Sequence, residues 1–444
     1  MGAGRDTRRG FALWLVAIVA LGIAARIAFS LLSASAEPVV DWTDDSFFAD
    51  VGANLAHGRG YVYAPPGSGP PQATAQHPPA FPVLLAGLDV LDMTSRAAHQ
   101  IALSLLSGVG IAFVALVGRR CFGDVAGLVA AAIAAIHPLW IQPAGVLMSE
   151  SLYLVILPLV LLCALRWLEG DGLWWAAALG LAAAVAALTR SEAVLLLPGL
   201  VAWAMLRPPI PRRELLLGGC AAAAGFVILV GPWLLRNEDK IGAPVLSTNL
   251  GHTLSGAYCG RTLDPGDEWY AAYDVNCTYG AAFEIKAEPL PEGESTWEGV
   301  PLDRELTDRS VQFMRDHAGS LPGVAAVHVL RTFGLWAPEH ELELSVREGR
   351  KPVLQRIGTY LHHPLLVLAF IGGIAALRGD RGRARSISLL TPVLVTCVVT
   401  AAFYGSFRFR TLSEPSIAIL AGIGAVALGR LLREPRARPT PSGS

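Results

Sequence analysis

Residues 11–32 read FALWLVAIVALGIAARIAFSLL, an apolar run with one ionisable side chain, Arg26. A membrane-spanning helix needs about 20 mostly apolar residues, so this run is long enough to cross a bilayer. Because it follows Arg5, Arg8 and Arg9 it resembles a secretory signal peptide, but it is long and lacks a convincing small-residue cleavage site. We therefore predict that it is the first span and is retained.

The same apolar character extends over the whole chain of 444 residues. Hydrophobic residues make up 53% of it, charged residues only 16%, and the mean hydropathy is +0.47. The 35 basic and 36 acidic side chains nearly cancel, which gives a net charge of −1. This composition argues against a cytosolic enzyme, a disordered scaffold and a nucleic-acid-binding protein with a basic face. It predicts an all-α polytopic protein of the cell membrane that has no nucleic-acid partner.

Nine further apolar runs bring the predicted number of spans to ten. They lie at residues 96–117, 125–137, 151–166, 173–189, 193–206, 215–235, 364–377, 387–404 and 415–432. Most connections between them are short, whereas two segments, 33–79 and 237–363, are long. The predicted domains are a module of spans one to seven over residues 1–236, a cap over 237–363, spans eight to ten over 364–432, and a disordered cytoplasmic tail over 433–444.

The distribution of charge orients these spans. If the N-terminus is cytoplasmic, the short segments on the inner side are rich in arginine and contain few acidic residues. The segment from Glu238 to Arg356 then lies outside, and its 19 acidic and 11 basic residues give it a net charge of −8. The positive-inside rule therefore predicts that both termini are cytoplasmic and that the two long segments are extracytoplasmic.

Long outer segments are where a function is expected. The second one has the pattern of an amphipathic helix across Asp303 to His317, which indicates a small folded cap. It also contains Cys259 and Cys277, which are either a disulfide, as an oxidising exterior would allow, or two free thiols. Their spacing alone does not decide between these alternatives.

The first outer segment carries an acidic cluster, DWTDDSFFADV, over residues 41–51. Asp44 and Asp45 stand where a helical pattern begins, and an acid at such a position commonly caps the helix and stabilises its dipole. That role needs only one acid. The alternative is a general base that faces a membrane-bound substrate, and these residues by themselves leave both interpretations open.

The whole loop resembles the GT-C superfamily of polyprenyl-phosphate-sugar-dependent glycosyltransferases, such as the protein O-mannosyltransferases and the lipid A aminoarabinose transferases. Members show an acidic pair, an aromatic residue, the pattern A..L..G.GY, and then a basic or polar residue before two prolines. The corresponding residues here are Asp44-Asp45, Phe48, Leu55, Gly58, Gly60-Tyr61 and His77-Pro78-Pro79. Phe48 replaces the usual Tyr, so that hydroxyl is absent. His77 replaces a frequent Lys, which makes the charge at this position depend on pH.

Further short matches follow in the order of the family. They are Met148 to Tyr153 with Glu150, Leu188 to Glu192 with Arg190, Gly231 to Asn237 with Arg236, and Phe407-Arg408-Phe409-Arg410 followed by Glu414-Pro415. The last of these resembles an Arg-Tyr-Arg segment with Phe in place of Tyr. Each match is short, and the specificity comes from their order, their spacing and their common outer side.

The resemblance implies roles for these residues. Asp44 is the expected catalytic base, Asp45 is its neighbour, and Glu150 is the second acid that closes the active site. The expected substrate-binding residues are Arg236, then His77, Arg408 and Arg410 for the leaving phosphate, together with Arg190 and Tyr61. The family includes members with and without a metal, so a divalent cation is possible, although no metal-type Cys or His spacing occurs.

The positions of these side chains support one site independently of the resemblance. Ionisable groups at span ends are costly unless they face water, a partner or a ligand, although snorkelling to the headgroups would explain any one of them taken singly. For Arg26, deeper in span one, pairing with an acid and lining the cavity both stay open.

The expected function is transfer of a sugar, with inversion, from a polyprenyl-phosphate donor to an extracytoplasmic hydroxyl on a cell-wall glycan, lipid or protein. The main alternative is a transporter or flippase of a lipid-linked substrate, although no paired inverted halves are evident. A second alternative is a non-enzymatic assembly factor whose outer loop binds cell-wall polymers.

Overall fold

The computed structural model describes residues 3–33, 44–64, 69–290, 298–347, 349–378 and 382–433. In these ranges the chain is almost entirely helical, with one short antiparallel pair of strands, β1 (Val62–Tyr63) and β2 (Gln72–Ala73). The all-α fold class is therefore confirmed. Asp41 to Thr43 of the acidic cluster, and the part of the predicted tail beyond residue 433, lie outside the described residues.

Seven of the described helices are long and apolar enough to cross a membrane. They are α1 (Ala3–Ser33), α4 (Arg96–Phe122), α7 (Glu150–Leu168), α10 (Arg212–Ile241), α17 (Pro352–Ala376), α18 (Gly382–Ala402) and α20 (Glu414–Arg433). An eighth span results if α5 (Asp124–Ile136) and α6 (Pro138–Gly145), which meet at a bend of 49°, are counted as one. The chain is therefore a multi-pass membrane protein.

The predicted count of ten spans is not confirmed. The other two predicted spans coincide with α8 (Leu173–Thr189) and with the 3-10 helix η1 (Ser191–Leu195) that continues into α9 (Leu196–Leu206). These helices are apolar but short. At 1.5 Å per residue, the 17 residues of α8 extend only about 26 Å, less than the ~30 Å of a hydrocarbon core.

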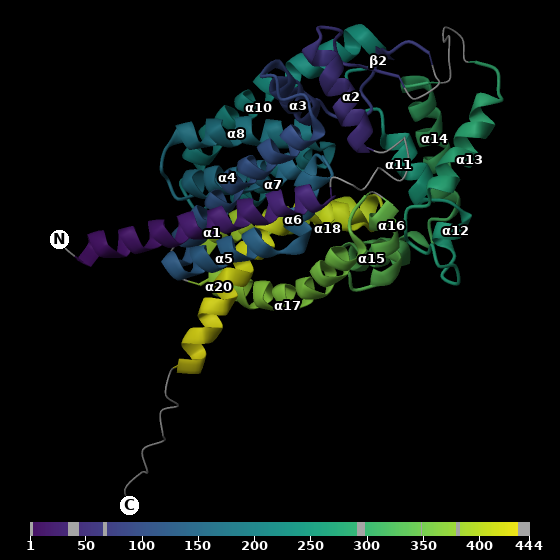
Figure 1. Cartoon of the computed structure of the whole chain (residues 1–444). Helices are drawn as coiled ribbons and strands as arrows, with labels where there is room; N and C mark the ends of the chain where they lie inside the picture. The colour runs from purple at the N-terminus through teal and green to yellow at the C-terminus, as the bar shows by residue number, and fades with distance from the viewer. Residues whose placement is uncertain are drawn as a thin grey trace, which may run out of the picture.

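The long helices form a bundle, and the extramembrane elements gather at one of its ends, at the right of Figure 1. The N-terminal end of α1 and the C-terminal end of α20 point away from that end. The elements of the gathered end are α2 (Asp44–Ala56), α3 (Ala80–Val90), α11 (Leu250–Ala257), α12 (Gly260–Leu263), α13 (Val275–Lys286), α14 (Val300–Asp316), α15 (Leu321–Thr332), α16 (Pro338–Arg347) and α19 (Phe407–Arg410).

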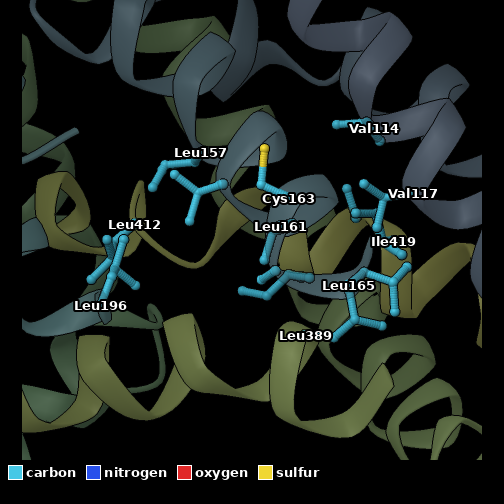
Figure 2. Packing of buried hydrophobic residues seen from close by; sticks show 14 of the residues in the cluster. Val114, Val117, Leu157, Leu161, Cys163, Leu165, Leu196, Leu389, Leu412 and Ile419 are labelled. Carbon is cyan, nitrogen blue, oxygen red and sulfur yellow. The ribbon is translucent and has the colours of Figure 1, made fainter. Parts of the chain in front are cut away.

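Helix α7 forms the centre of the largest hydrophobic core. Its Leu157, Leu161 and Leu165 belong to one buried cluster with Val114 of α4 and Ile419 of α20, part of which Figure 2 shows. Apolar side chains of this kind stabilise a bundle by dense packing and not by directional hydrogen bonds. The bundle thus provides a rigid base for the loops at the gathered end.

Small residues let neighbouring helices approach closely elsewhere in the bundle. A methyl group added to Gly180 of α8 would collide with the backbone of α10 at Ala222. Gly424 of α20 has the same relation to the Leu368 carbonyl of α17. Close backbone approach through glycine and alanine is the usual way in which helices pack in a membrane.

The bend between α5 and α6 explains the buried charge of span one. Arg26 is 1% exposed, and its Nη2 and Nη1 donate to the carbonyl oxygens of Ala134 and Ala135 at 2.9 and 3.0 Å. These carbonyls lie in the last turn of α5, where they lack helical partners and where the helix dipole favours a cation. Arg26 therefore caps a broken helix, and it also lines a narrow pocket with Ser107 and Ser151.

The long segment after residue 237 is folded, as its pattern predicts. The amphipathic helix expected at 303–317 is α14, and a disulfide joins Cys259 to Cys277. The segment contacts the bundle, because α15 packs against α18 and the Tyr258 hydroxyl donates to the Ala402 carbonyl oxygen at 2.9 Å.

Candidate functional site

The acidic pair of the first outer segment begins helix α2. Phe47, Phe48 and Val51 are buried on one face of this helix, so its orientation is fixed by packing. Both acids stand in the first turn, where the helix dipole favours them. Their partners differ, however: Asp45 accepts from the Ser46 backbone N–H and from Arg96 of α4, whereas Asp44 contacts His77 and Arg408.

Asp44 lies between the side chains of Arg408 and His77. Its Oδ2 accepts a hydrogen bond from Arg408 Nη2 at 2.6 Å, and its Oδ1 is 3.4 Å from His77 Nε2. Burial raises the pKa of Asp44, but the charges and hydrogen bonds of Arg408 and His77 outweigh it and hold the pKa well below the usual range. The carboxylate is therefore ionised at neutral pH, as a general base must be.

The ring of His77 is fixed by aromatic neighbours. It meets Phe47 at 4.9 Å and Phe48 at 5.1 Å between ring centroids. The Tyr61 hydroxyl donates to the His77 carbonyl oxygen at 2.8 Å, and the Tyr61 ring packs on Trp233. In this arrangement Tyr61 holds the loop that presents His77 to Asp44.

Glu150, the first residue of α7, joins Asp44 through one arginine. Its side chain is 1% exposed, and its Oε1 accepts from Arg408 Nε and from Arg190 Nη1, both at 3.0 Å. Arg350 Nη2 lies 3.6 Å from the same oxygen. Arg408 therefore bridges the two predicted acids, which are 106 positions apart in sequence.

Arg190 has a second carboxylate partner. Its Nε donates to Glu192 Oε1 at 2.6 Å. Burial lowers the pKa of Arg190, but the neighbouring carboxylates of Glu192 and Glu150 raise it by more. The pKa of Arg190 therefore lies above its usual value. We call the seven side chains of this region the acid–arginine cluster; they are Asp44, His77, Glu150, Arg190, Glu192, Arg350 and Arg408.

The formal charges in the acid–arginine cluster balance when His77 is neutral, because it has as many guanidinium groups as carboxylates. Partly buried charges of this kind persist only when they are paired. An incoming phosphate would therefore have to compete with Asp44 and Glu150 for Arg408.

Two of the predicted site residues, Asp45 and Arg236, contact groups outside the acid–arginine cluster. Asp45 Oδ2 accepts from Arg96 Nη2 at 2.9 Å. Arg236 donates to the carbonyl oxygens of Tyr61 and Thr74, both at 2.7 Å. Arg236 therefore fastens the same loop that carries His77, and its guanidinium is held by protein carbonyls.

Arg410 lies in the same short helix as Arg408, and its side chain is buried, with 1% exposed. Its Nε donates to Glu414 Oε1 at 2.6 Å. A narrow pocket lined by Arg410, Glu414, Glu150 and Arg350, among others, connects this buried pair with the acid–arginine cluster.

Arg350 was not among the residues predicted from the sequence. It belongs to the acidic outer segment, where an isolated arginine is not conspicuous. A usable signal was its position two residues before Pro352, which begins a span, because the other cluster residues also stand at span ends. No group of three or more His, Cys, Asp and Glu side chains able to hold a metal ion occurs among the residues that the structure describes.

One protein-family model matches part of the sequence. The family model of the dolichyl-phosphate-mannose-protein mannosyltransferases matches residues 76–235, a segment that includes His77, Glu150 and Arg190. No curated protein matches the sequence.

Solved structures match nearly the whole chain. The archaeal oligosaccharyltransferase AglB from Archaeoglobus fulgidus, in complex with an inhibitory peptide and a dolichol-phosphate, is 13% identical with a TM-score of 0.52, over 96% of this chain and 52% of that one. The apo form of the Archaeoglobus fulgidus oligosaccharyltransferase is 14% identical with a TM-score of 0.54, over 95% of this chain and 51% of that one. ArnT from Cupriavidus metallidurans bound to undecaprenyl phosphate is 14% identical over 94% of this chain and 79% of that one, with a TM-score of only 0.43.

The resemblance to the GT-C superfamily is thereby confirmed at the level of the fold and of the matched segment. The chain spans about half the length of the archaeal oligosaccharyltransferases that it matches.

Proposed function

We propose that this protein is a membrane glycosyltransferase that moves a sugar from a polyprenyl-phosphate donor to an acceptor hydroxyl, with Asp44 as the general base. The observation that supports the proposal most is the contact of the Asp44 carboxylate with Arg408 and His77. This arrangement combines a base with cations that suit a phosphate. In this proposal the prenyl chain of the donor lies in the bilayer, against the spans.

The chemistry is a single displacement. Asp44 takes the proton of the acceptor hydroxyl while the acceptor oxygen attacks the anomeric carbon of the donor sugar. The bond from that carbon to the phosphate oxygen breaks with both electrons going to the oxygen, which leaves polyprenyl phosphate. Attack from the face opposite the leaving group inverts the anomeric configuration.

The leaving phosphate needs positive charge as it develops, and Arg408 and His77 are placed to provide it. A guanidinium fork suits phosphate oxygens. We assign Arg408 and His77 to the phosphate ahead of Arg236, because Arg236 is hydrogen-bonded to Tyr61 and Thr74. When the phosphate draws Arg408 away, Asp44 loses a cationic partner and becomes a stronger base.

Glu150 has a supporting role in this proposal. It is almost fully buried and contacts Arg408, Arg190 and Arg350. Its carboxylate therefore keeps three guanidinium groups aimed at one region. Removal of one partner from such a buried network is expected to be strongly unfavourable.

The membrane orientation is also part of the proposal. The positive-inside rule places the acid–arginine cluster and the cap outside the membrane, with both termini in the cytoplasm. The acceptor would then be an extracytoplasmic glycan, lipid or protein.

The experiment measures release of polyprenyl phosphate from a panel of radiolabelled polyprenyl-phosphate sugars. Purified protein in lipid is supplied with a membrane extract as acceptor, and the wild type is compared with Asp44→Asn. The matched control is Asp50→Asn, since Asp50 lies in the same helix but is exposed. Release that needs Asp44 but not Asp50 supports the proposal. Absence of release with every donor, together with labelled lipid crossing the bilayer, would favour a flippase instead.

A further inference from the structure

A buried ion pair lies directly behind the proposed site and has no part in the chemistry above. Arg410 and Glu414 are 1% and 6% exposed. Arg410 Nε donates to Glu414 Oε1 at 2.6 Å, and Trp140 Nε1 donates to Glu414 Oε2 at 3.2 Å. Thr332 adds a backbone carbonyl that accepts from Arg410 Nη1 at 3.5 Å. The pair is thus tied to α6, α15, α19 and α20.

Arg410 belongs to the same short helix as Arg408. Helix α19 has four residues, too few to hold its own conformation without tertiary contacts. Consecutive residues of a helix are about 100° apart around its axis, so two positions two residues apart project in roughly opposite directions. An Arg410 side chain fixed on one side therefore leaves Arg408 on the side of Asp44 and Glu150.

The segment before α19 is fastened by the same neighbour. Thr332 Oγ1 accepts from the Ser406 backbone N–H at 3.3 Å, while the Thr332 carbonyl faces Arg410. The Ser406 hydroxyl in turn accepts from the Arg408 N–H at 3.3 Å. Ser406, just before α19, and Arg410, its last residue, are consequently both held against Thr332 of α15. The contact of Arg410 bears on the rotation of α19 about its own axis.

We propose that the Arg410–Glu414 pair is a positioning device that fixes the rotation of α19, so that Arg408 reaches both Asp44 and Glu150. Arg410 and Glu414 are positioning residues and do not touch the substrate. This inference rests on the proposed function, because it concerns the aim of the arginine assigned to the leaving phosphate. It also assigns Arg410 a role other than the substrate contact that the sequence resemblance implies.

A role in stability alone accounts less well for the pair. Replacement of a buried ion pair by apolar residues of similar volume is often neutral or stabilising, since the desolvation of two charges offsets their attraction. The direction of a guanidinium, in contrast, is fixed well by a carboxylate four positions later in the chain. The neighbouring Trp140 indole N–H fixes that carboxylate in turn.

The test is a double-mutant cycle on the rate of polyprenyl phosphate release. Wild type, Glu414→Gln, Arg408→Ala and the double variant are compared in the assay described above. If Glu414 acts through Arg408, Glu414→Gln slows release about tenfold in the wild-type background and less than about twofold in the Arg408→Ala background. Effects that multiply, or a Glu414→Gln variant as fast as wild type, would overturn the inference.

A gentler variant guards against a folding defect of Glu414→Gln. Trp140→Phe keeps a ring in place but removes the N–H that donates to Glu414. It is expected to slow release about threefold, and this effect should also vanish in the Arg408→Ala background. Persistence of the effect there would contradict the positioning role.

A second readout does not depend on turnover. Water-soluble carbodiimide modifies protonated carboxyl groups, so labelling of Asp44, followed by peptide mass spectrometry, reports whether Arg408 contacts it. Glu414→Gln should accelerate this labelling as much as Arg408→Ala does, with no further gain in the double variant. Unchanged labelling would refute the positioning role of Glu414 even if the protein is a glycosyltransferase. Accelerated labelling, without any release by the wild type, would refute only the proposed function.

Discussion

Substitution of Arg408 by lysine keeps the positive charge but removes the fork. Arg408 uses Nη2 for Asp44 at 2.6 Å and Nε for Glu150 at 3.0 Å, and one ammonium group cannot reproduce both directions. The side chains of Arg408 and Asp44 are 18% and 25% exposed, so solvent screens their interaction only partly. Loss of one hydrogen bond to a charged group costs about 1.5 to 3 kcal/mol.

If the same fork binds the leaving phosphate, that cost appears in the barrier. We therefore expect Arg408→Lys to lower the rate of polyprenyl phosphate release about 10- to 100-fold, since about 1.4 kcal/mol corresponds to a factor of ten. The assay is single-turnover release from a labelled donor, with Arg59→Lys as control because Arg59 is exposed. An Arg408→Lys rate within twofold of wild type would show that the fork is not used.

Three further predictions concern pH, the loop and the bundle. Because the pKa of Asp44 is held well below its usual range, its carboxylate is ionised above that pKa. Release should therefore fall on acidification only below the normal carboxyl range, which a pH profile of kcat/KM measures. Tyr61→Phe removes the hydrogen bond to the His77 carbonyl and should cost about 1 kcal/mol, seen as a lower midpoint of thermal unfolding and slower release. Gly424→Ala should destabilise the bundle because a methyl group there meets the backbone of α17, whereas Gly429→Ala in the same helix meets nothing within 4 Å and should leave the midpoint unchanged or raised.

The gathering of charged residues from several helix ends could be predicted from the sequence. Asp44, Glu150, Arg190 and Arg408 were expected to share one side of the membrane, and the structure brings their side chains into contact. Hydropathy and the distribution of arginines determine which end of a span is outside. Residues confined to one end of a compact bundle have little room to lie far apart.

The direction of individual side chains could not be predicted in the same way. Arg236 stands at the expected end of its helix, yet its guanidinium turns to the carbonyls of Tyr61 and Thr74. Nothing in the spacing of residues says which carbonyls a folded loop will present. Arg350, which lies 3.6 Å from Glu150, was overlooked for a related reason, because it belongs to a mostly acidic segment in which an arginine is not conspicuous.

The number of spans could not be decided from the hydropathy of the sequence alone. The run predicted at 173–189 has the same bounds as α8, and at 17 residues this helix is shorter than the long helices of the bundle. Arg26 is comparable, since its partners are carbonyls exposed by a bend 108 residues later in the chain. Such pairings follow from tertiary packing alone.

The central claim is that Asp44 performs base catalysis in sugar transfer. Its most direct test is the single-turnover release of polyprenyl phosphate by wild type, Asp44→Asn and Asp50→Asn with the donor sugar identified in the panel, alongside measured donor binding. We predict that Asp44→Asn binds the donor but releases its phosphate about 10²- to 10⁴-fold more slowly, as expected for loss of a general base, while Asp50→Asn matches wild type. Equal release by all three proteins would contradict the claim.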